Sequence, residues 1–268
     1  MMRLPVRILS DLHLGHRASR IRNAEELRPL VSGAGTVVFN GDTWEELAGP
    51  WKQQSAEMLA DLKRILKEEG CDTVFLLGNH DPGWDGPAHL SLAEGKILVT
   101  HGDALIRNAS PWKHEILSGN SIIEEIWNEF PDAAQNLESR LEIARQIATR
   151  LPSRHLPTSS SLLSRIADAA WPPQRALAML DAWLRQGSLG ADFCETYAPD
   201  AEILVIGHFH RRAIHSNRGR TIINTGSFVV PGPASWVSWD GKMLSTGKIM
   251  ESGAMSTLGP KSRTWEIF

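Results

Sequence analysis

The sequence predicts an α/β protein with parallel strands, and two observations carry this prediction. Short apolar runs typical of buried strands alternate with helical patterns in the first part of the chain, an order that favours a parallel sheet. Polar clusters also follow the ends of these runs. Because the carboxyl ends of parallel strands meet at one edge of a sheet, where such folds bind ligands, we expect a ligand site at that edge.

The predicted elements follow one another along the chain in a strand–helix order. Between the second and third strands, Trp51–Glu69 is predicted to be a helix, because Met58, Leu62 and Ile65 recur at helical spacing and Gly70 is a typical C-terminal stop. The predicted strands are Val6–Ser10, Thr36–Asn40, Thr73–Leu77, Ile97–Thr100, Ile203–Ile206, Thr221–Asn224 and Ser235–Trp239.

The stretch of residues 105–199 interrupts this pattern, because it contains no strand-like run. We therefore expect a core formed by residues 1–104 and 200–268, with residues 105–199 inserted as a helical cap. Thr158–Ser161 reads as a polar, hinge-like loop within the cap. The helices expected in the cap are Asn136–Leu151, Leu162–Ala170 and Arg175–Arg185.

Composition limits the class of protein. The chain has 268 residues, of which 42% are hydrophobic, enough for one large domain or a domain with an insertion. A net charge of −3 gives no indication of nucleic-acid binding. Cys71 and Cys194 are too few for a disulfide framework, so a reducing, cytoplasmic setting is expected. We expect no signal peptide and no membrane span, which leaves peripheral membrane contact open. The tail after Lys248, which contains Gly and Ser, is expected to be loosely held.

Five polar clusters that follow strand-like runs supply oxygen and imidazole ligands. Asp and His without Cys suit Mn²⁺, Fe or Zn²⁺ better than a structural zinc site. A pair of such ions ~3.5–4 Å apart needs one ligand that touches both, and can activate water against a phosphate ester. A carboxylate can bridge two ions, which makes Asp42 the expected bridge. The clusters are Asp11-Leu12-His13, Gly41-Asp42, Gly78-Asn79-His80-Asp81, His101-Gly102-Asp103 and Gly207-His208-Phe209-His210.

At these residues the chain resembles the calcineurin-like metallophosphoesterase superfamily, whose pattern D-x-H, G-D, G-N-H-D/E, H and G-H-x-H is present unaltered. The resemblance covers about Val6–Asp103 and Ile203–Ser227, and it implies a four-layer α/β/β/α sandwich. It implies that His80 lies beside the scissile phosphate and that Asp81 orients His80. The ligands that it implies are Asp11, His13, Asp42 and His210 for one metal, and Asp42, Asn79, His101 and His208 for the second.

The function that this resemblance implies is hydrolysis of a phosphate ester or pyrophosphate bond with a metal-bridging hydroxide as nucleophile. Mn²⁺ is the expected metal, with Fe and Zn²⁺ as alternatives, and phosphatase, phosphodiesterase and pyrophosphatase activities all stay open. The cap position and Gly207–His215 also resemble UDP-2,3-diacylglucosamine pyrophosphatases of lipid A precursor synthesis. That subfamily has Arg where this chain has His80. The substrate is therefore a small-molecule or lipid-linked phosphate, and a non-catalytic metal-binding scaffold is the rival class.

Two sets of cap residues each have two interpretations. The arginines either clamp a diphosphate or form a solvated helix face. The tryptophans either line a substrate pocket or pack the core of the cap itself. The arginines are Arg140, Arg145, Arg150, Arg154, Arg165 and Arg175, and the tryptophans are Trp112, Trp127, Trp171 and Trp183.

Overall fold

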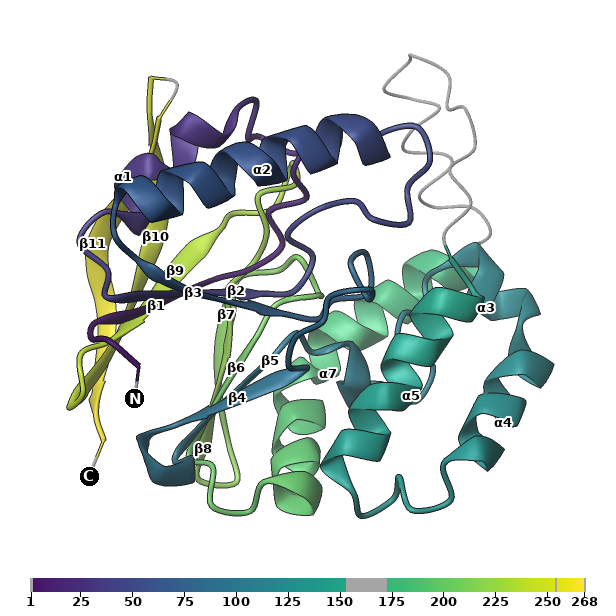
Figure 1. Cartoon of the computed structure of the whole chain (residues 1–268). Helices are drawn as coiled ribbons and strands as arrows, with labels where there is room; N and C mark the ends of the chain where they lie inside the picture. Colours follow the sequence, from purple (N-terminus) through teal and green to yellow (C-terminus); the bar gives the residue numbers. More distant parts are fainter. Residues whose placement is uncertain (1, 153–172, 254, 268) are drawn as a thin grey trace.

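The computed structural model describes residues 2–152, 173–253 and 255–267. Two β-sheets pack face to face, and helices cover the outer face of each sheet (Figure 1). The four-layer α/β/β/α arrangement that the resemblance implied is therefore confirmed. Within the described ranges, no helix is both long enough and apolar enough to cross a membrane.

The first sheet has six strands in the order β11-β10-β9-β1-β2-β3. Its centre is the predicted parallel unit, since β1, β2 and β3 pair in parallel, whereas β9, β10 and β11 pair antiparallel. The strands are β1 (Val6–Leu9), β2 (Thr36–Asn40), β3 (Asp72–Leu76), β9 (Ser235–Trp239), β10 (Met243–Ser252) and β11 (Met255–Glu266).

The expectation of a loosely held tail after Lys248 is wrong. β10 and β11 form an antiparallel hairpin at the edge of the six-stranded sheet, and Lys248 itself pairs with Ser235 of β9. At position 247 only glycine fits, because a β-carbon there would collide with the indole of Trp236. The described residues of this tail are therefore strands held by hydrogen bonds to their neighbours.

The second sheet has five strands in the order β4-β5-β6-β8-β7. β5, β6 and β8 pair in parallel, and the edge strands β4 and β7 are antiparallel to their neighbours. β4 and β7 are additions to the predicted strands. The strands are β4 (His89–Leu92), β5 (Ile97–Thr100), β6 (Ile203–Ile206), β7 (Ala213–Asn217) and β8 (Arg220–Asn224).

The core between the two sheets is apolar. Inward-facing residues of β1, β2, β5 and β6, such as Ile8, Val38, Val99 and Val205, form one cluster and are fully buried. Alternate residues of the same strands point to the outer helices, as the pleat of a strand requires. Both faces of these strands are therefore covered, which explains why they read as continuous apolar runs.

Helix α2 (Lys52–Glu68) covers the outer face of the six-stranded sheet together with α1 (Arg28–Val31) and the short helix η1 (Ala24–Leu27) (Figure 1). The helix predicted at Trp51–Glu69 is thus confirmed. Its buried residues recur on one face at the predicted spacing. They are Ser55, Met58, Leu59, Leu62, Ile65 and Leu66.

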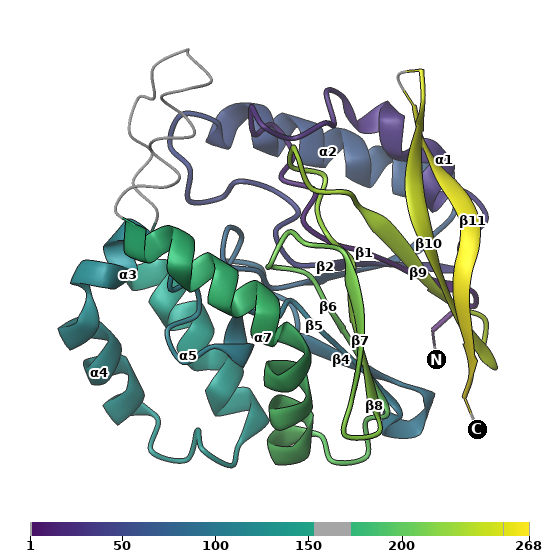
Figure 2. The same ribbon diagram turned by 180° about the vertical axis from the view of Figure 1, so that it is seen from behind.

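The outer face of the five-stranded sheet carries helices from the described part of residues 105–199 (Figure 2). Helix α5 realises the predicted Asn136–Leu151 helix, and the Asn136 side chain caps it by accepting the Ser139 N–H at 3.1 Å. Helix α7 contains the predicted Arg175–Arg185 helix but runs longer. The helices are α3 (His114–Ser118), α4 (Asn120–Glu129), α5 (Leu137–Arg150) and α7 (Pro173–Tyr197), with η2 (Ala93–Gly95) and η3 (Asp103–Leu105) before them.

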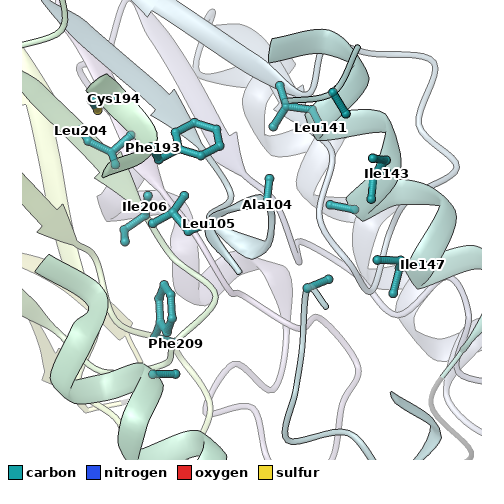
Figure 3. Packing of buried hydrophobic residues seen from close by; sticks show 14 of the residues in the cluster. Ala104, Leu105, Leu141, Ile143, Ile147, Phe193, Cys194, Leu204, Ile206 and Phe209 are labelled. Atoms are coloured by element: carbon teal, nitrogen blue, oxygen red, sulfur yellow. The ribbon is translucent and has the colours of Figure 1, made fainter. Parts of the chain in front are cut away.

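These helices share one apolar cluster with the five-stranded sheet, in which Phe193 lies beside Leu204 and Leu105 lies beside Ile206 (Figure 3). The division into a core and an inserted cap stays a prediction. The predicted helix Leu162–Ala170 and the loop Thr158–Ser161 lie outside the described residues.

Candidate metal centre

The predicted ligands come together where the strands of both sheets end. Asp11 and His13 follow β1, Asp42 follows β2, and His210 follows β6. The ligand atoms of these four residues all lie within 4.8 Å of one another. The first predicted ligand set is therefore assembled in space, from segments about two hundred positions apart in the chain.

The second predicted set adjoins the first through Asp42. His101 Nε2 lies 3.4 Å from Asp42 Oδ2 and 3.3 Å from Asn79 Oδ1. The ring of His208 packs against the ring of His101, with centroids 5.1 Å apart. Because His13 Nε2 is 3.6 Å from the same Asp42 Oδ2, one carboxylate oxygen lies between a ligand of each set.

Hydrogen bonds on the far side of three imidazoles fix which nitrogen carries a lone pair. His13 Nδ1 donates to Glu45 Oε1 at 2.7 Å, and His101 Nδ1 donates to the Asn40 carbonyl at 3.0 Å. His208 Nε2 donates to the Ala109 carbonyl at 3.1 Å. In the neutral rings, His13 Nε2, His101 Nε2 and His208 Nδ1 are consequently lone-pair donors, the pattern by which proteins orient metal-binding histidines.

The lone pairs of His13 Nε2 and His101 Nε2 both face the Asp42 carboxylate, at 3.6 and 3.4 Å. His13 Nε2 and His210 Nε2 are 3.2 Å apart, and His210 Nε2 is 3.2 Å from Asp11 Oδ1. Acceptors that face acceptors in a buried site require a cation or protons between them. This donor set of carboxylates, imidazoles and one amide oxygen fits a pair of divalent transition metals.

Burial and charge act against each other on the ionisable groups of the site. Burial pushes the pKa of Asp42 up, but the neighbouring His101 and His80 outweigh it and hold that pKa well below its usual range. The pKa of Asp11 is lowered in the same way, chiefly through His210, against the effect of burial. For His101, burial lowers the pKa and Asp42 raises it, with a net rise. Both aspartates are therefore held as carboxylates.

Glu45 is a site residue that the sequence analysis missed. Its carboxylate is 1% exposed and accepts hydrogen bonds from two imidazoles, His13 Nδ1 at 2.7 Å and His80 Nδ1 at 2.9 Å. The prediction that Asp81 orients His80 differs from this arrangement, because Glu45 occupies that position. The only sequence signal was that Glu45 lies three residues after Asp42 in the same loop.

Asp81 instead holds the loop that carries Asp42. Its two oxygens accept the backbone N–H groups of Asp42 at 3.0 Å, Thr43 at 2.7 Å and Trp44 at 3.3 Å. Burial and the charge of Asp42 raise the pKa of Asp81 to about 7. Asp81 therefore positions the expected bridging ligand and does not contact the imidazole of His80.

The backbone at the site is strained. Asp11, His13, Asp42, His208 and His210 all have φ between 48° and 65°, the left-handed region. Asp and His enter this region more often than most residues, but each such residue still costs roughly 1–3 kcal/mol. Four of these residues are the ones whose ligand atoms lie within 4.8 Å of one another, so the left-handed conformation coincides with the predicted metal ligands.

Two glycines of the motifs are explained by close approach. A β-carbon on Gly41, which has φ of 76°, would collide with the ring of His101. A β-carbon on Gly207 would collide with Asp11 Oδ2 and Ser10 Oγ. The G-D and G-H-x-H patterns thus contain glycine because neighbouring ligands pack directly on the backbone there.

A cavity of about 100 Å³ opens onto the site. Its floor includes Asp42, Asn79 and His80, and its roof comes from the helical stretch of residues 105–199. The roof residues are Ser110, Trp112, Lys113, Met179 and Trp183. Trp112 and Trp183 therefore line the cavity and also pack against the apolar cluster beneath the helices, so their role toward a substrate stays a prediction.

The other predicted cap residues have structural partners elsewhere. Trp127 lies between the guanidinium groups of Arg107 and Arg140, at 4.4 and 4.9 Å from its ring centroid. Arg145 is paired with Glu142, and Arg150 with Glu129. Arg175 Nε donates to the Trp112 carbonyl at 2.7 Å. Arg154, Arg165 and Trp171 lie outside the described residues. The described arginines therefore do not form a phosphate clamp in this cavity.

Comparison with known proteins gives one family match. The family model described as calcineurin-like phosphoesterase matches residues 4–212. A search among curated proteins gave no match.

Solved structures of similar fold include vacuolar protein sorting 29 from Cryptosporidium parvum, at 13% identity, 99% coverage of this chain, 98% of that chain and a TM-score of 0.41. A predicted phosphoesterase from Streptococcus pneumoniae has 15% identity, coverages of 99% and 98%, and a TM-score of 0.39. The phosphoesterase Yfce from E. coli has 16% identity, coverages of 99% and 100%, and a TM-score of 0.42.

Proposed function

Because this chain belongs to the calcineurin-like phosphoesterase family, we propose that it hydrolyses phosphate esters or pyrophosphate bonds with the help of two divalent metal ions. One observation carries the proposal. Asp42 Oδ2 lies 3.6 Å from His13 Nε2 and 3.4 Å from His101 Nε2, and hydrogen bonds on the far side of both rings leave lone pairs at these nitrogens.

The residues that would hold the metals follow from this arrangement. Asp42 would be shared between the two ions. When bound, such a pair supplies Lewis acidity and lowers the pKa of coordinated water toward neutrality. We propose Mn²⁺ as the metal, although the same donors accept Fe or Zn²⁺. Asp11, His13 and His210 would complete one ion's ligands, and Asn79, His101 and His208 those of the other.

His80 is proposed to act on the substrate. It lines the cavity, and its backbone N–H donates to Asp42 Oδ1 at 2.8 Å. Since Nδ1 donates to Glu45, Nε2 is the atom left to face a substrate, where it would stabilise charge or protonate the leaving oxygen. Asp81 would support the reaction indirectly, by fixing the backbone N–H groups around Asp42.

Replacement of Asp42 by Asn tests the proposal. The amide keeps the shape of the side chain but loses the charge that a shared ligand needs. We expect the metal content of Mn²⁺-loaded protein, measured by mass spectrometry, to fall below the two equivalents of the unaltered chain. Turnover of an aryl phosphate should fall roughly 100-fold or more, since such ions supply several kcal/mol of transition-state stabilisation.

Asp61→Asn, at an exposed position of α2, is the matched control and should retain both metal and activity. Full activity in the Asp42→Asn variant would refute the assignment.

A lipid-linked pyrophosphate substrate is a second candidate, favoured by one surface feature. Leu177, Leu180 and Leu184 of α7 are 65%, 48% and 70% exposed, on the helix that contributes Met179 and Trp183 to the cavity. Such leucines would suit contact with acyl chains or a membrane surface. This candidate predicts much faster cleavage of detergent-dispersed acylated UDP-sugars than of water-soluble analogues, and equal rates would exclude it.

A metal-binding scaffold without activity is the rival class. In such a scaffold the same residues would bind metal but would not hydrolyse a substrate. A chain that retains two metal equivalents but turns over none of a panel of aryl phosphates, nucleotides and UDP-sugars would favour the scaffold.

A further inference from the structure

We propose that Lys113 binds the substrate phosphate and makes the site select phosphoryl groups that carry two negative charges, such as phosphomonoesters or terminal phosphates of pyrophosphates. The inference deepens the proposed function and rests on it. Neither the ligand motifs nor the family pattern includes this residue.

The loop before α3 presents Lys113 to the site. Lys113 lines the same cavity as Asp42, Asn79 and His80. Its backbone N–H donates to the Ser110 carbonyl at 2.9 Å, closing a tight turn. The loop is therefore structured and faces the predicted metals.

Two contacts tie this loop to its surroundings. The Ala109 carbonyl accepts the His208 Nε2–H at 3.1 Å, so the loop touches a predicted ligand. On the other side, Arg175 of α7 donates to the carbonyl of Trp112 at 2.7 Å. The position of Lys113 is consequently coupled to the metal-binding loops and to α7.

Lys113 is an ammonium group without a protein partner. Within residues 2–152, 173–253 and 255–267, its side chain makes no hydrogen bond or ion pair, and it is the one Lys or Arg among those that line the cavity. The pKa of Lys113 is lowered, because burial outweighs the opposite effect of the nearby Asp42 and Glu45 carboxylates. A cation held in a partly buried site is unfavourable unless an anion accompanies it.

Two cap arginines differ from Lys113 because each has an ionic partner. Arg145 and Arg150 form ion pairs with Glu142 and Glu129. A bound phosphate would give the Lys113 ammonium an anionic acceptor, and charge-assisted hydrogen bonds of this kind are among the stronger ones.

The charge and size of the cavity favour a monoester over a diester. A diester carries one charge on phosphorus and a second bulky group, whereas a monoester carries up to two charges and one group. The cavity of about 100 Å³ is small beside the ~300–1,000 Å³ of typical drug-sized sites. Trp112 and Trp183 would then contact the single leaving group.

The test compares two substrates in the Mn²⁺-loaded full chain, para-nitrophenyl phosphate and bis(para-nitrophenyl) phosphate. Lys113→Met should lower kcat/KM for the monoester roughly 10–100-fold, as expected for the loss of one charge-assisted hydrogen bond, and change the diester value by less than about 3-fold. Lys113→Arg should restore most of the monoester rate. Lys52→Met, at an exposed position that begins α2, is the control.

A binding measurement without turnover separates this inference from the proposed function. Calorimetric titration of inorganic phosphate into Mn²⁺-loaded protein should show at least about 10-fold weaker binding in Lys113→Met, with an unchanged metal content. Equal losses for both substrates, or loss of metal, would mean that Lys113 only balances the carboxylates and would overturn the inference. If the unaltered chain hydrolyses neither substrate, the proposed function fails, and the phosphate titration alone decides the role of Lys113.

Discussion

The replacement of Glu45 by Gln tests whether the site depends on a residue that is not itself a predicted ligand. The Glu45 carboxylate accepts hydrogen bonds from His13 Nδ1 at 2.7 Å and His80 Nδ1 at 2.9 Å and is 1% exposed. Gln has the same shape, but one of its two ends is an NH₂ donor. One of the two ring N–H groups would then face a donor inside a buried site.

The magnitude follows from this geometry. Loss of an outer carboxylate that orients a metal-binding His lowers metal affinity or activity roughly 10–100-fold, which equals about 1.4–2.8 kcal/mol. If the Gln oxygen turns to His13, metal binding should persist and the loss should fall on kcat through His80. If the oxygen turns to His80, the affinity for metal should fall instead.

The assay is Mn²⁺ affinity by competition with a chelator, together with steady-state turnover of an aryl phosphate. Glu57→Gln on the exposed face of α2 is the control, and the melting temperature of each variant shows whether it is folded. Unchanged metal affinity and unchanged kcat in a folded Glu45→Gln variant would refute the claim that this carboxylate orients the two rings.

Two further predictions follow from packing. Gly207→Ala places a β-carbon against Asp11 Oδ2, so Mn²⁺ affinity measured by chelator competition should fall at least about tenfold, while Gly49→Ala, with no atom within 4 Å of its added carbon, should bind normally. Leu204→Ala, at a fully buried position of β6, should reduce the free energy of unfolding measured in urea by roughly 2–5 kcal/mol and leave the metal content unchanged. A loss below about 1 kcal/mol would show that the position is not tightly packed.

Most of the ligands could be located from sequence because they follow strands that are buried on both faces. Val6–Leu9 and Ile203–Ile206 are buried along their length and are apolar except for Arg7, so the polar residues after them stand out. The parallel order then requires their carboxyl ends to meet. Local pattern and long-range geometry agree at these positions, whereas the division of the ligands into two sets came from the family resemblance.

Edge strands carry no such signal. β7 is only partly buried throughout, and much of β11 is exposed, so neither shows an apolar run or a clear alternation. β7 pairs with β8 and β11 with β10, each the adjacent strand in the chain, and these pairs form edges of the sheets. Pairing of this kind depends on tertiary context that residue patterns do not contain.

Glu45 and Lys113 escaped prediction for a related reason. Glu45 is one acidic residue in a loop with another Glu beside it, and only the folded chain brings its carboxylate between His13 and His80. Lys113 is one lysine in a stretch that contains many more arginines, so its residue type alone does not distinguish it. In the folded chain, however, Arg145 forms an ion pair within its own helix and Arg150 forms one with the adjacent helix. Partners, not residue types, decide which charge is available to a ligand.

The site is unfavourable for stability in two ways, and both bear on why these residues are present. Asp11 and Asp42 are buried carboxylates, whose desolvation is costly unless a cation offsets it. The left-handed backbone at Asp11, Asp42 and His208 adds strain that a glycine or a regular turn would avoid. Their oxygens also accept backbone N–H groups, that of His208 for Asp11 and that of His80 for Asp42, so each carboxylate holds the loop of another site residue. These hydrogen bonds offset only part of the desolvation of two neighbouring carboxylates, and cations held between the carboxylates and the imidazoles would offset the rest.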